Sequence, residues 1–190
     1  MSFLHRIQQD LTLAMNAQDE LRLRVLRIVK SALKNKEIEK ILDRSSRILG
    51  VDIDPTGLQK ISSCARCTPR VANRLLKRVR DFCQIKNKKS IDSVVAAEAL
   101  EMIDIDHIGL EQADREILKT IIEKFQGGPV GINSIAAAAS EEIKTIEDVY
   151  EPYLLQLGFL NRTSKGRIAT QKAYEHLGLK YPPKQAALTL

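Results

Sequence analysis

The sequence predicts a mainly α-helical protein that ends in a winged helix with a small β-hairpin wing. Apolar residues recur at helical spacing through residues 1–104. From residue 110 to residue 170 the pattern changes to a helix, a short apolar strand, two further helices and a hairpin, which is the element order of a winged helix. Of the 190 residues, 44% are hydrophobic and 28% are charged, so the chain can bury a core and is not a long disordered segment.

The first third of the chain predicts three helical segments. Two amphipathic helices over residues 2–36 are separated by a break at residues 16–19, and their apolar positions are Phe3, Leu4, Ile7 and Leu11, then Leu23, Leu26, Val29 and Leu33. A third helical pattern starts near Ile38 and stops at Gly50, because glycine is the commonest residue just past a helix end.

Three more helices are expected before residue 104. Asp54 and Pro55 open the first of them. Thr68 is the expected N-cap of the second and Pro69 its first residue. This helix turns apolar residues inward and places Arg74, Lys77, Arg78 and Arg80 largely outward. After a loop at residues 87–90, a further helix is expected over residues 91–102.

A linker at residues 105–109 precedes the winged-helix pattern. Its first helix is expected over residues 110–125 and is ended by the Gly127-Gly128-Pro129 turn. A short apolar piece, residues 130–132, leads to Asn133 as the expected N-cap of a helix over residues 134–139. Residues 145–157 form the third helix, with Thr145 as its cap and a kink expected at Pro152, which lacks an amide donor.

The hairpin comprises residues 159–163 and 167–170, joined by a turn at residues 164–166, and three cations flank its tip: Arg162, Lys165 and Arg167. Cations on a protruding hairpin can neutralise phosphates without reading bases. The preceding helix, residues 145–157, contains three acids and no Arg or Lys, which disfavours base reading in the major groove. Two interpretations remain open: a wing that binds the DNA backbone, and a winged helix that binds protein.

Charge is distributed unevenly along the chain. Residues 60–89 hold ten Lys and Arg against the single acid Asp81, a net +9. Residues 106–161 hold four against ten acids, a net −6, and residues 162–190 hold six against one, a net +5. A charge run is often only a solvated helix face, so the first basic segment alone leaves a binding role and a solvated face equally open.

The three cysteines suggest a reducing compartment and no disulfide framework, since their number is odd. Cys64 and Cys67 have the spacing of a metal or redox pair, but no second pair accompanies them, so no metal site is expected. No stretch is long and apolar enough to cross a bilayer, and Arg6 comes too early for a secretory signal. A soluble, cytoplasmic protein is expected.

Five strings between residues 41 and 179 resemble the RuvB family, the bacterial motor of Holliday junction branch migration: ILDRSSRILGVDID, TPRVANRLLKRVRDF, ALEMIDID, IIEKFQGGPVG and TIEDVYEPYLLQLGFLNRT. The resemblance implies an AAA+ lid over residues 41–104, a winged-helix DNA-binding domain over residues 105–180 and a flexible tail over residues 181–190. It also implies a role in DNA recombination and repair, with DNA, RuvA-like protein and RuvB-like subunits as partners.

The resemblance also assigns individual residues. Arg162, Lys165 and Arg167 are expected to contact the DNA backbone. Arg70 is similar to the sensor 2 arginine of AAA+ lids, which touches the γ-phosphate of ATP held against a large ATPase domain. The family uses ATP and Mg, but no G-x-x-x-x-G-K-[ST] loop occurs in these 190 residues. ATP hydrolysis by this chain alone is therefore not expected, nor is a cofactor or catalytic residue of its own.

Residues 1–40 resemble a different family, the GatB/YqeY-like proteins linked to tRNA-dependent amidotransferases, through FLHRIQQDLTLAMNAQDELRLRVLRIVKSALKNKEIE. The two resemblances meet near residues 37–41, where a continuous helix could preserve the phase of both. We interpret the chain as a fusion, arising from a genomic deletion, an assembly error or a conceptual reading frame, and expect a monomer or dimer.

The leading functional hypothesis is a DNA-binding fragment of a RuvB-like motor. One alternative is a non-enzymatic interaction protein that docks on intact RuvB-type subunits. A third is an accessory of a tRNA amidotransferase.

Overall fold

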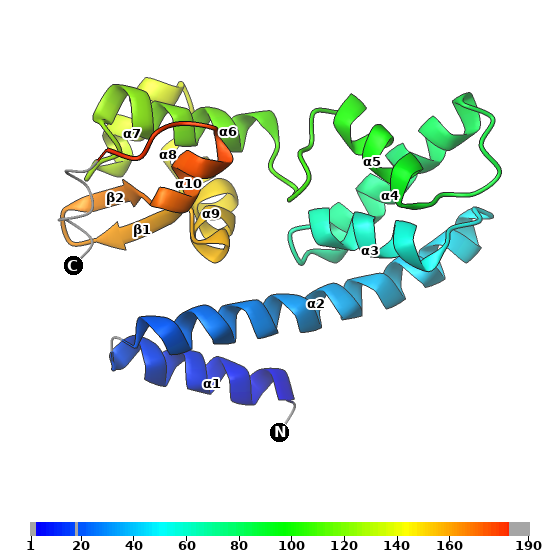
Figure 1. The fold of residues 1–190 in the computed structure, drawn as a ribbon, viewed down its shortest axis with the longest axis horizontal. Coiled ribbons are helices and arrows are strands. Elements are labelled where there is room, and N and C mark those ends of the chain that lie inside the picture. Colours follow the sequence, from blue (N-terminus) through cyan, green and yellow to red (C-terminus); the bar gives the residue numbers. More distant parts are fainter. Residues whose placement is uncertain (1–2, 18, 183–190) are drawn as a thin grey trace. The chain divides into compact units, whose positions relative to one another are not determined.

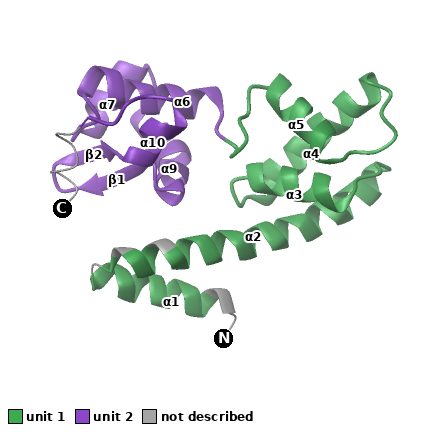
Figure 2. Ribbon diagram, in the orientation of Figure 1, with its two compact units in different colours: residues 1–109 green, residues 110–190 purple. Residues whose placement is uncertain are grey.

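The computed structural model describes residues 3–17 and 19–182 and divides into two compact units, residues 1–109 and residues 110–190 (Figure 2). Each unit has a core of its own. Most of the expected tail, residues 183–190, lies outside the described residues. Within the described part of the chain, no helix has the length and apolarity needed to cross a membrane.

The first unit opens with a helical hairpin in which α1 (Phe3–Asn16) packs along the N-terminal half of α2 (Glu20–Leu49; Figure 1). Ile7, Leu11 and Ala14 are the buried side chains of α1. α2 is a single helix of 30 residues. The separate helix expected from Ile38 is therefore wrong: no Gly or Pro occurs between residues 20 and 49, so nothing interrupts the backbone hydrogen bonds.

The ends of α2 follow the sequence signals. The Asp19 carboxylate accepts a hydrogen bond from the Arg22 amide at 3.0 Å. Gly50 ends the helix in the left-handed conformation, with φ of 64°, as predicted.

Three shorter helices complete the first unit around the C-terminal half of α2: α3 (Pro55–Cys64), α4 (Pro69–Ile85) and α5 (Ser93–Met102). Their shared core contains Leu42, Ile61, Leu75, Leu76, Ile91 and Leu100. Ile53 and Ile91 form a parallel bridge, and Gly57 lies against the Ile91 carbonyl so closely that a Cβ would collide with it. Because Ile91 is used in this bridge, α5 starts at Ser93, two residues later than expected.

Asp54 caps α3, as predicted. Its Oδ1 accepts the Gly57 amide at 2.8 Å and the Thr56 hydroxyl at 2.7 Å. These hydrogen bonds, led by that of Gly57, stabilise the charged carboxylate and lower the pKa of Asp54 below its ordinary value. Thr68 and Pro69 take their expected places at the start of α4, but the Thr68 hydroxyl donates to the Arg66 carbonyl at 3.1 Å and caps no amide.

The second unit is a winged helix. Its elements are α6 (Gln112–Lys119), the π-helical turn η1 (Thr120–Lys124), α7 (Ile132–Ala139), α8 (Ile143–Thr145), the π-helical turn η2 (Ile146–Tyr150), α9 (Glu151–Leu157), β1 (Leu160–Thr163), β2 (Gly166–Ala169) and α10 (Gln171–His176). Its core includes Leu118, Ile121, Ile135, Ile146, Leu154 and Phe159. α10 was not predicted from the sequence; its residues pack Ala173 and Tyr174 inward.

β1 and β2 form an antiparallel hairpin, with Arg162 opposite Arg167 (Figure 1). Val130 adds a bridge on the other edge of β2, exchanging hydrogen bonds of 2.8 and 3.0 Å with Arg167. Gly166, with φ of 134°, lies so close to Val130 that a side chain there would collide with its backbone. β2 is therefore the central strand, with neighbours on both edges.

Two local expectations for this unit are wrong. α7 starts at Ile132 behind Gly131, not behind Asn133, because Gly131 is extended directly after the Val130 bridge and its carbonyl accepts the Ile135 amide. The third helix starts at Ile143, since the Ile146 amide bonds to the Glu142 carbonyl. The kink expected at Pro152 stays a prediction. Ahead of this proline the chain forms the π-helical turn η2, a feature that often accompanies kinks.

A candidate nucleic-acid interface on the wing

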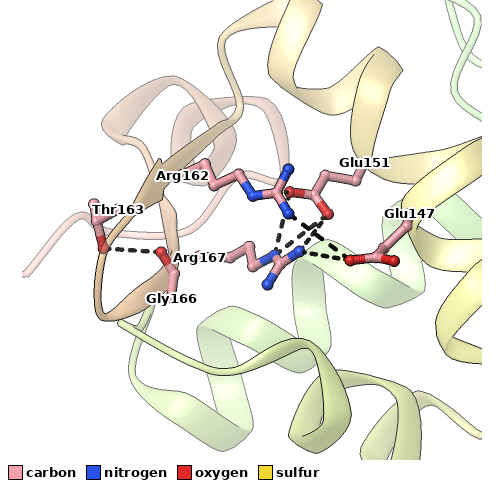
Figure 3. Close-up of polar contacts among 6 residues, drawn as sticks. All are labelled: Glu147, Glu151, Arg162, Thr163, Gly166 and Arg167. Atoms are coloured by element: carbon pink, nitrogen blue, oxygen red, sulfur yellow. Dashed lines mark hydrogen bonds and ion pairs between the residues drawn. The ribbon is translucent and has the colours of Figure 1, made fainter.

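The tip of the wing is a two-residue turn, Ser164 and Lys165, between the paired residues Thr163 and Gly166. The Thr163 hydroxyl donates to the Gly166 carbonyl at 2.9 Å and closes this turn (Figure 3). The Lys165 side chain is exposed and makes no hydrogen bond or ion pair with the residues that the structure describes. The hairpin thus holds one unpaired ammonium group at its outermost point.

Behind the tip lies a group of four charged side chains, which we call the wing ion cluster: Glu147, Glu151, Arg162 and Arg167. Arg167 donates from Nε to both Glu151 oxygens at 3.2 and 3.3 Å, and from an Nη to Glu151 at 2.9 Å and to Glu147 at 3.3 Å. The Glu151 and Arg167 side chains are only 4% and 10% exposed. This is a buried, multiply hydrogen-bonded ion pair.

Arg162 belongs to the same cluster but is bound far more loosely. Its guanidinium lies 3.8 Å from Glu147 and 3.7 Å from Glu151, and its side chain is 61% exposed. Figure 3 shows both arginines reaching from the hairpin toward the two acids. The cross-strand register puts the arginines opposite each other, and the four-residue spacing of the acids puts them on one helix face.

β2 is flanked by β1 on one edge and by Val130 on the other, and Arg167, Ile168 and Ala169 are all buried. The Arg167 side chain is buried against Glu151, with which it shares three of its hydrogen bonds. A guanidinium can be buried at such a position when carboxylates neutralise it. Of the three wing cations named from the sequence, the structure leaves Arg162 and Lys165 accessible and encloses Arg167.

The helix that precedes the wing in the chain should repel DNA less than its three acids suggest, because two of them pair with arginines of the wing. We call residues 143–157 the recognition segment. Its acids Glu147 and Glu151 are turned to the arginines of the wing, and Asp148 is exposed. Because the helix begins at Ile143, it also includes Lys144, which is exposed. Glu147 and Glu151 were not predicted as partners of the wing, although their i, i+4 spacing was an available signal.

Arg70 lies at the second residue of α4, in the first unit. It is exposed and has no ion pair or hydrogen bond with the described residues. A nucleotide would find no phosphate loop in these 190 residues, and no group of three metal-ligating side chains occurs among those described.

The three cysteines belong to the first unit and are free thiols. Cys64 is buried, and burial raises the pKa of its thiol above the ordinary value. Cys67 is half-buried. Its backbone and that of Arg66 both have φ of 52°, an uncommon conformation for residues other than glycine.

The fold and the wing together define a class: a helical lid bundle followed by a winged helix with a cationic hairpin, as in AAA-type DNA motors. Comparison with family models then gives the particular family. Residues 33–106 match the RuvB AAA lid domain and residues 107–178 match the RuvB C-terminal winged helix domain. Residues 4–47 match a Yqey-like protein. Residues 33–178 of this chain belong to the RuvB family, and both resemblances predicted from the sequence are confirmed.

Individual relatives agree with these matches. The chain is 56% identical over 148 residues to the Holliday junction branch migration complex subunit RuvB of Chloroflexus aggregans, covering 78% of this chain and 42% of the relative. It is 58% identical over 146 residues to that of Synechocystis, covering 77% and 40%. The solved structure of the Thermotoga maritima RuvB Holliday junction branch migration motor is similar with a TM-score of 0.76 and 45% identity, over 78% of this chain and 50% of that one.

These likenesses confirm the predicted mainly helical fold with its lid, winged helix and hairpin. The chain spans about two fifths of the length of the curated relatives that it matches.

Proposed function

We propose that this chain binds the phosphate backbone of DNA through its wing and so supplies the DNA-contacting part of a RuvB-type branch-migration assembly. One observation carries the proposal: the wing has two accessible cations. Lys165 at the hairpin tip is exposed and has no partner among the described residues, and the loosely held Arg162 is 61% exposed. Both can meet phosphates without a rearrangement of the fold.

The three wing cations have different tasks in this proposal. Lys165 contacts phosphate as a point charge, and Arg162 exchanges its long contacts with Glu147 and Glu151 for a closer one with phosphate oxygens. Exposed ion pairs of this kind contribute at most about 1 kcal/mol, so giving them up costs little. Arg167 supports binding from within, because it neutralises Glu151 and keeps two carboxylates from repelling the DNA.

Contacts of this type are sensitive to salt and insensitive to sequence. Each neutralised phosphate releases counterions and contributes about −0.9 to the slope of log K against log salt concentration. Two contacts give a slope of about −1.8, so affinity should fall about tenfold between 50 and 200 mM salt.

The wider assembly enters through the relatives. Their names describe a subunit of a Holliday junction branch migration complex and a branch migration motor. We propose that this chain acts in DNA recombination and repair in the cytoplasm, with RuvA-like protein and RuvB-like subunits as partners. ATP and Mg would be held by those subunits, and Arg70 would approach the γ-phosphate only with the lid docked against an ATPase domain.

A second function rests on a different observation. The recognition segment exposes two apolar side chains, Ile143 at 42% and Val149 at 51%, next to Asp148. Such a surface suits a protein partner, and it favours the alternative that the chain docks on intact RuvB-type subunits without enzymatic activity.

The test is fluorescence anisotropy of a labelled four-way junction and a labelled duplex at 50 and 200 mM salt. The Arg162→Gln/Lys165→Gln variant should bind both DNAs more weakly and lose most of the salt dependence that the wing provides. A matched control, Lys119→Gln/Lys180→Gln, removes the same charge from exposed positions of the second unit outside the wing. Equal binding by the two variants would refute the wing as the contact and favour the protein-docking function.

A further inference from the structure

A second cationic surface lies on the first unit, along one face of α4. Arg70, Arg74, Lys77 and Arg78 are all exposed. At about 100° per residue they fall within an arc of about 100°, and the opposite side of the helix is buried through Ala72, Leu75, Leu76, Val79, Phe82 and Cys83. We call these four residues the α4 face.

The segment that contains the α4 face, residues 60–89, is poor in acids that could neutralise its positive charge. Asp81 is the single acid among residues 60–89, and Arg80 engages it from Nε at 3.0 Å and from an Nη at 2.6 Å. Arg70, Lys77 and Arg78 make no hydrogen bond or ion pair with the described residues. At least these three cations are therefore available to an anionic partner.

We propose that, while no ATPase domain is docked on the lid and Arg70 has no nucleotide to approach, the α4 face binds the phosphate backbone of a nucleic-acid duplex, as a site separate from the wing. It extends DNA contact to the lid and depends on none of the wing residues. From Arg70 to Arg78 the helix rises about 12 Å, and a duplex strand carries one phosphate per about 3.4 Å of its axis, so three to four phosphates lie within reach.

Two features favour a duplex over other anionic partners. The α4 face has no exposed aromatic side chain on which unpaired bases could stack, since Phe82 is buried. Protein interfaces centre on buried apolar or aromatic anchors, whereas the four residues of the α4 face are all cationic. The exposed Ile85 lies at the C-terminal end of the helix, beyond these residues.

The test replaces three cations and leaves Arg70 in place. Arg74→Gln/Lys77→Gln/Arg78→Gln removes up to three phosphate contacts and should make the salt slope of duplex binding shallower by about 2 to 3. The matched control, Arg27→Gln/Lys36→Gln/Arg47→Gln, makes the same charge change on exposed positions of α2, where Lys36 and Arg47 already pair with acids. It should change the slope by less than about 0.5.

Both triple variants are also measured in the Arg162→Gln/Lys165→Gln background, so that the two sites are judged separately. A shallower slope from the α4 variant in both backgrounds supports the lid site, whatever the wing does. An unchanged slope, with circular dichroism showing an intact fold, overturns it and leaves the wing proposal standing.

A polyglutamate competitor tests the remaining class of partner, an acidic protein. If the α4 variant loses polyglutamate binding but keeps its duplex binding, the face is a docking site for acidic protein and the duplex proposal is wrong. Duplex binding lost by the α4 variant, with polyglutamate competing only weakly against the wild type, supports it.

Discussion

Replacing Arg167 with methionine tests how much the buried pair of Arg167 and Glu151 stabilises the winged helix. Glu151 is 4% exposed and Arg167 10%, and the pair is joined by hydrogen bonds of 2.9 to 3.3 Å. Removing one partner of a buried ion pair costs about 3–5 kcal/mol, because the other charge is left without compensation. Arg162 stays 3.7 Å from Glu151, so we expect the lower end, about 3 kcal/mol.

That loss is measurable as a melting temperature. For a domain the size of the second unit, residues 110–190, each kcal/mol shifts the midpoint by about 4–8 °C. Arg167→Met should therefore lower the midpoint of the winged-helix transition by about 12–24 °C in differential scanning calorimetry. The control, Arg162→Met, alters a 61% exposed side chain of the same cluster and should cost less than about 1 kcal/mol.

A second variant identifies the uncompensated charge as the cause. Glu151→Gln/Arg167→Met removes both charges of the pair, and we expect it to regain at least half of the midpoint lost by Arg167→Met alone. Equal midpoints for Arg167→Met and Arg162→Met would refute the reasoning, because the buried pair would then contribute no more than an exposed one.

Three further predictions concern single sites. Glu147→Gln removes the more exposed of the two acids beside Arg162. In anisotropy titrations the duplex affinity should therefore rise about two- to fivefold at low salt, with an unchanged salt slope. The lowered pKa of Asp54 means that its carboxylate stabilises the first unit above the unfolded-state pKa and that this contribution is lost as the pH falls through the folded-state value; the stabilities of wild type and Asp54→Asn, measured by urea denaturation, should therefore converge on acidification. Cys67 should react with a thiol reagent before Cys64, whose burial raises its pKa, and mass spectrometry of early products showing Cys64 modified first would contradict this.

Some helix ends were predictable from a local signal alone. Gly50 and the Asp54-Pro55 pair ended and opened helices as expected, because left-handed glycine and N-cap carboxylates act within a few residues. The separation of α2 into two helices failed for the opposite reason: its changing apolar pattern reflects a change of packing partner, from α1 to α3 and α4, and not a break in the backbone.

The wing shows what local sequence signals do not predict, namely which of its cations are exposed. The sequence placed Arg162, Lys165 and Arg167 on the hairpin correctly, but exposure depends on what lies against each side chain. Val130, far away in the sequence, pairs with the second edge of β2, and the Arg167 side chain is buried against Glu151. The spacing of Glu147 and Glu151 puts them on one helix face, but only the fold shows that this face meets the wing.

The most direct test of the central claim is the slope of log K against log salt concentration for duplex binding, measured by anisotropy over a series from 50 to 300 mM. Wild type should have a slope steeper by about 1.8 than Arg162→Gln/Lys165→Gln, corresponding to two phosphate contacts at the wing. Identical slopes and affinities for the two proteins would contradict the account and show that the wing does not contact DNA.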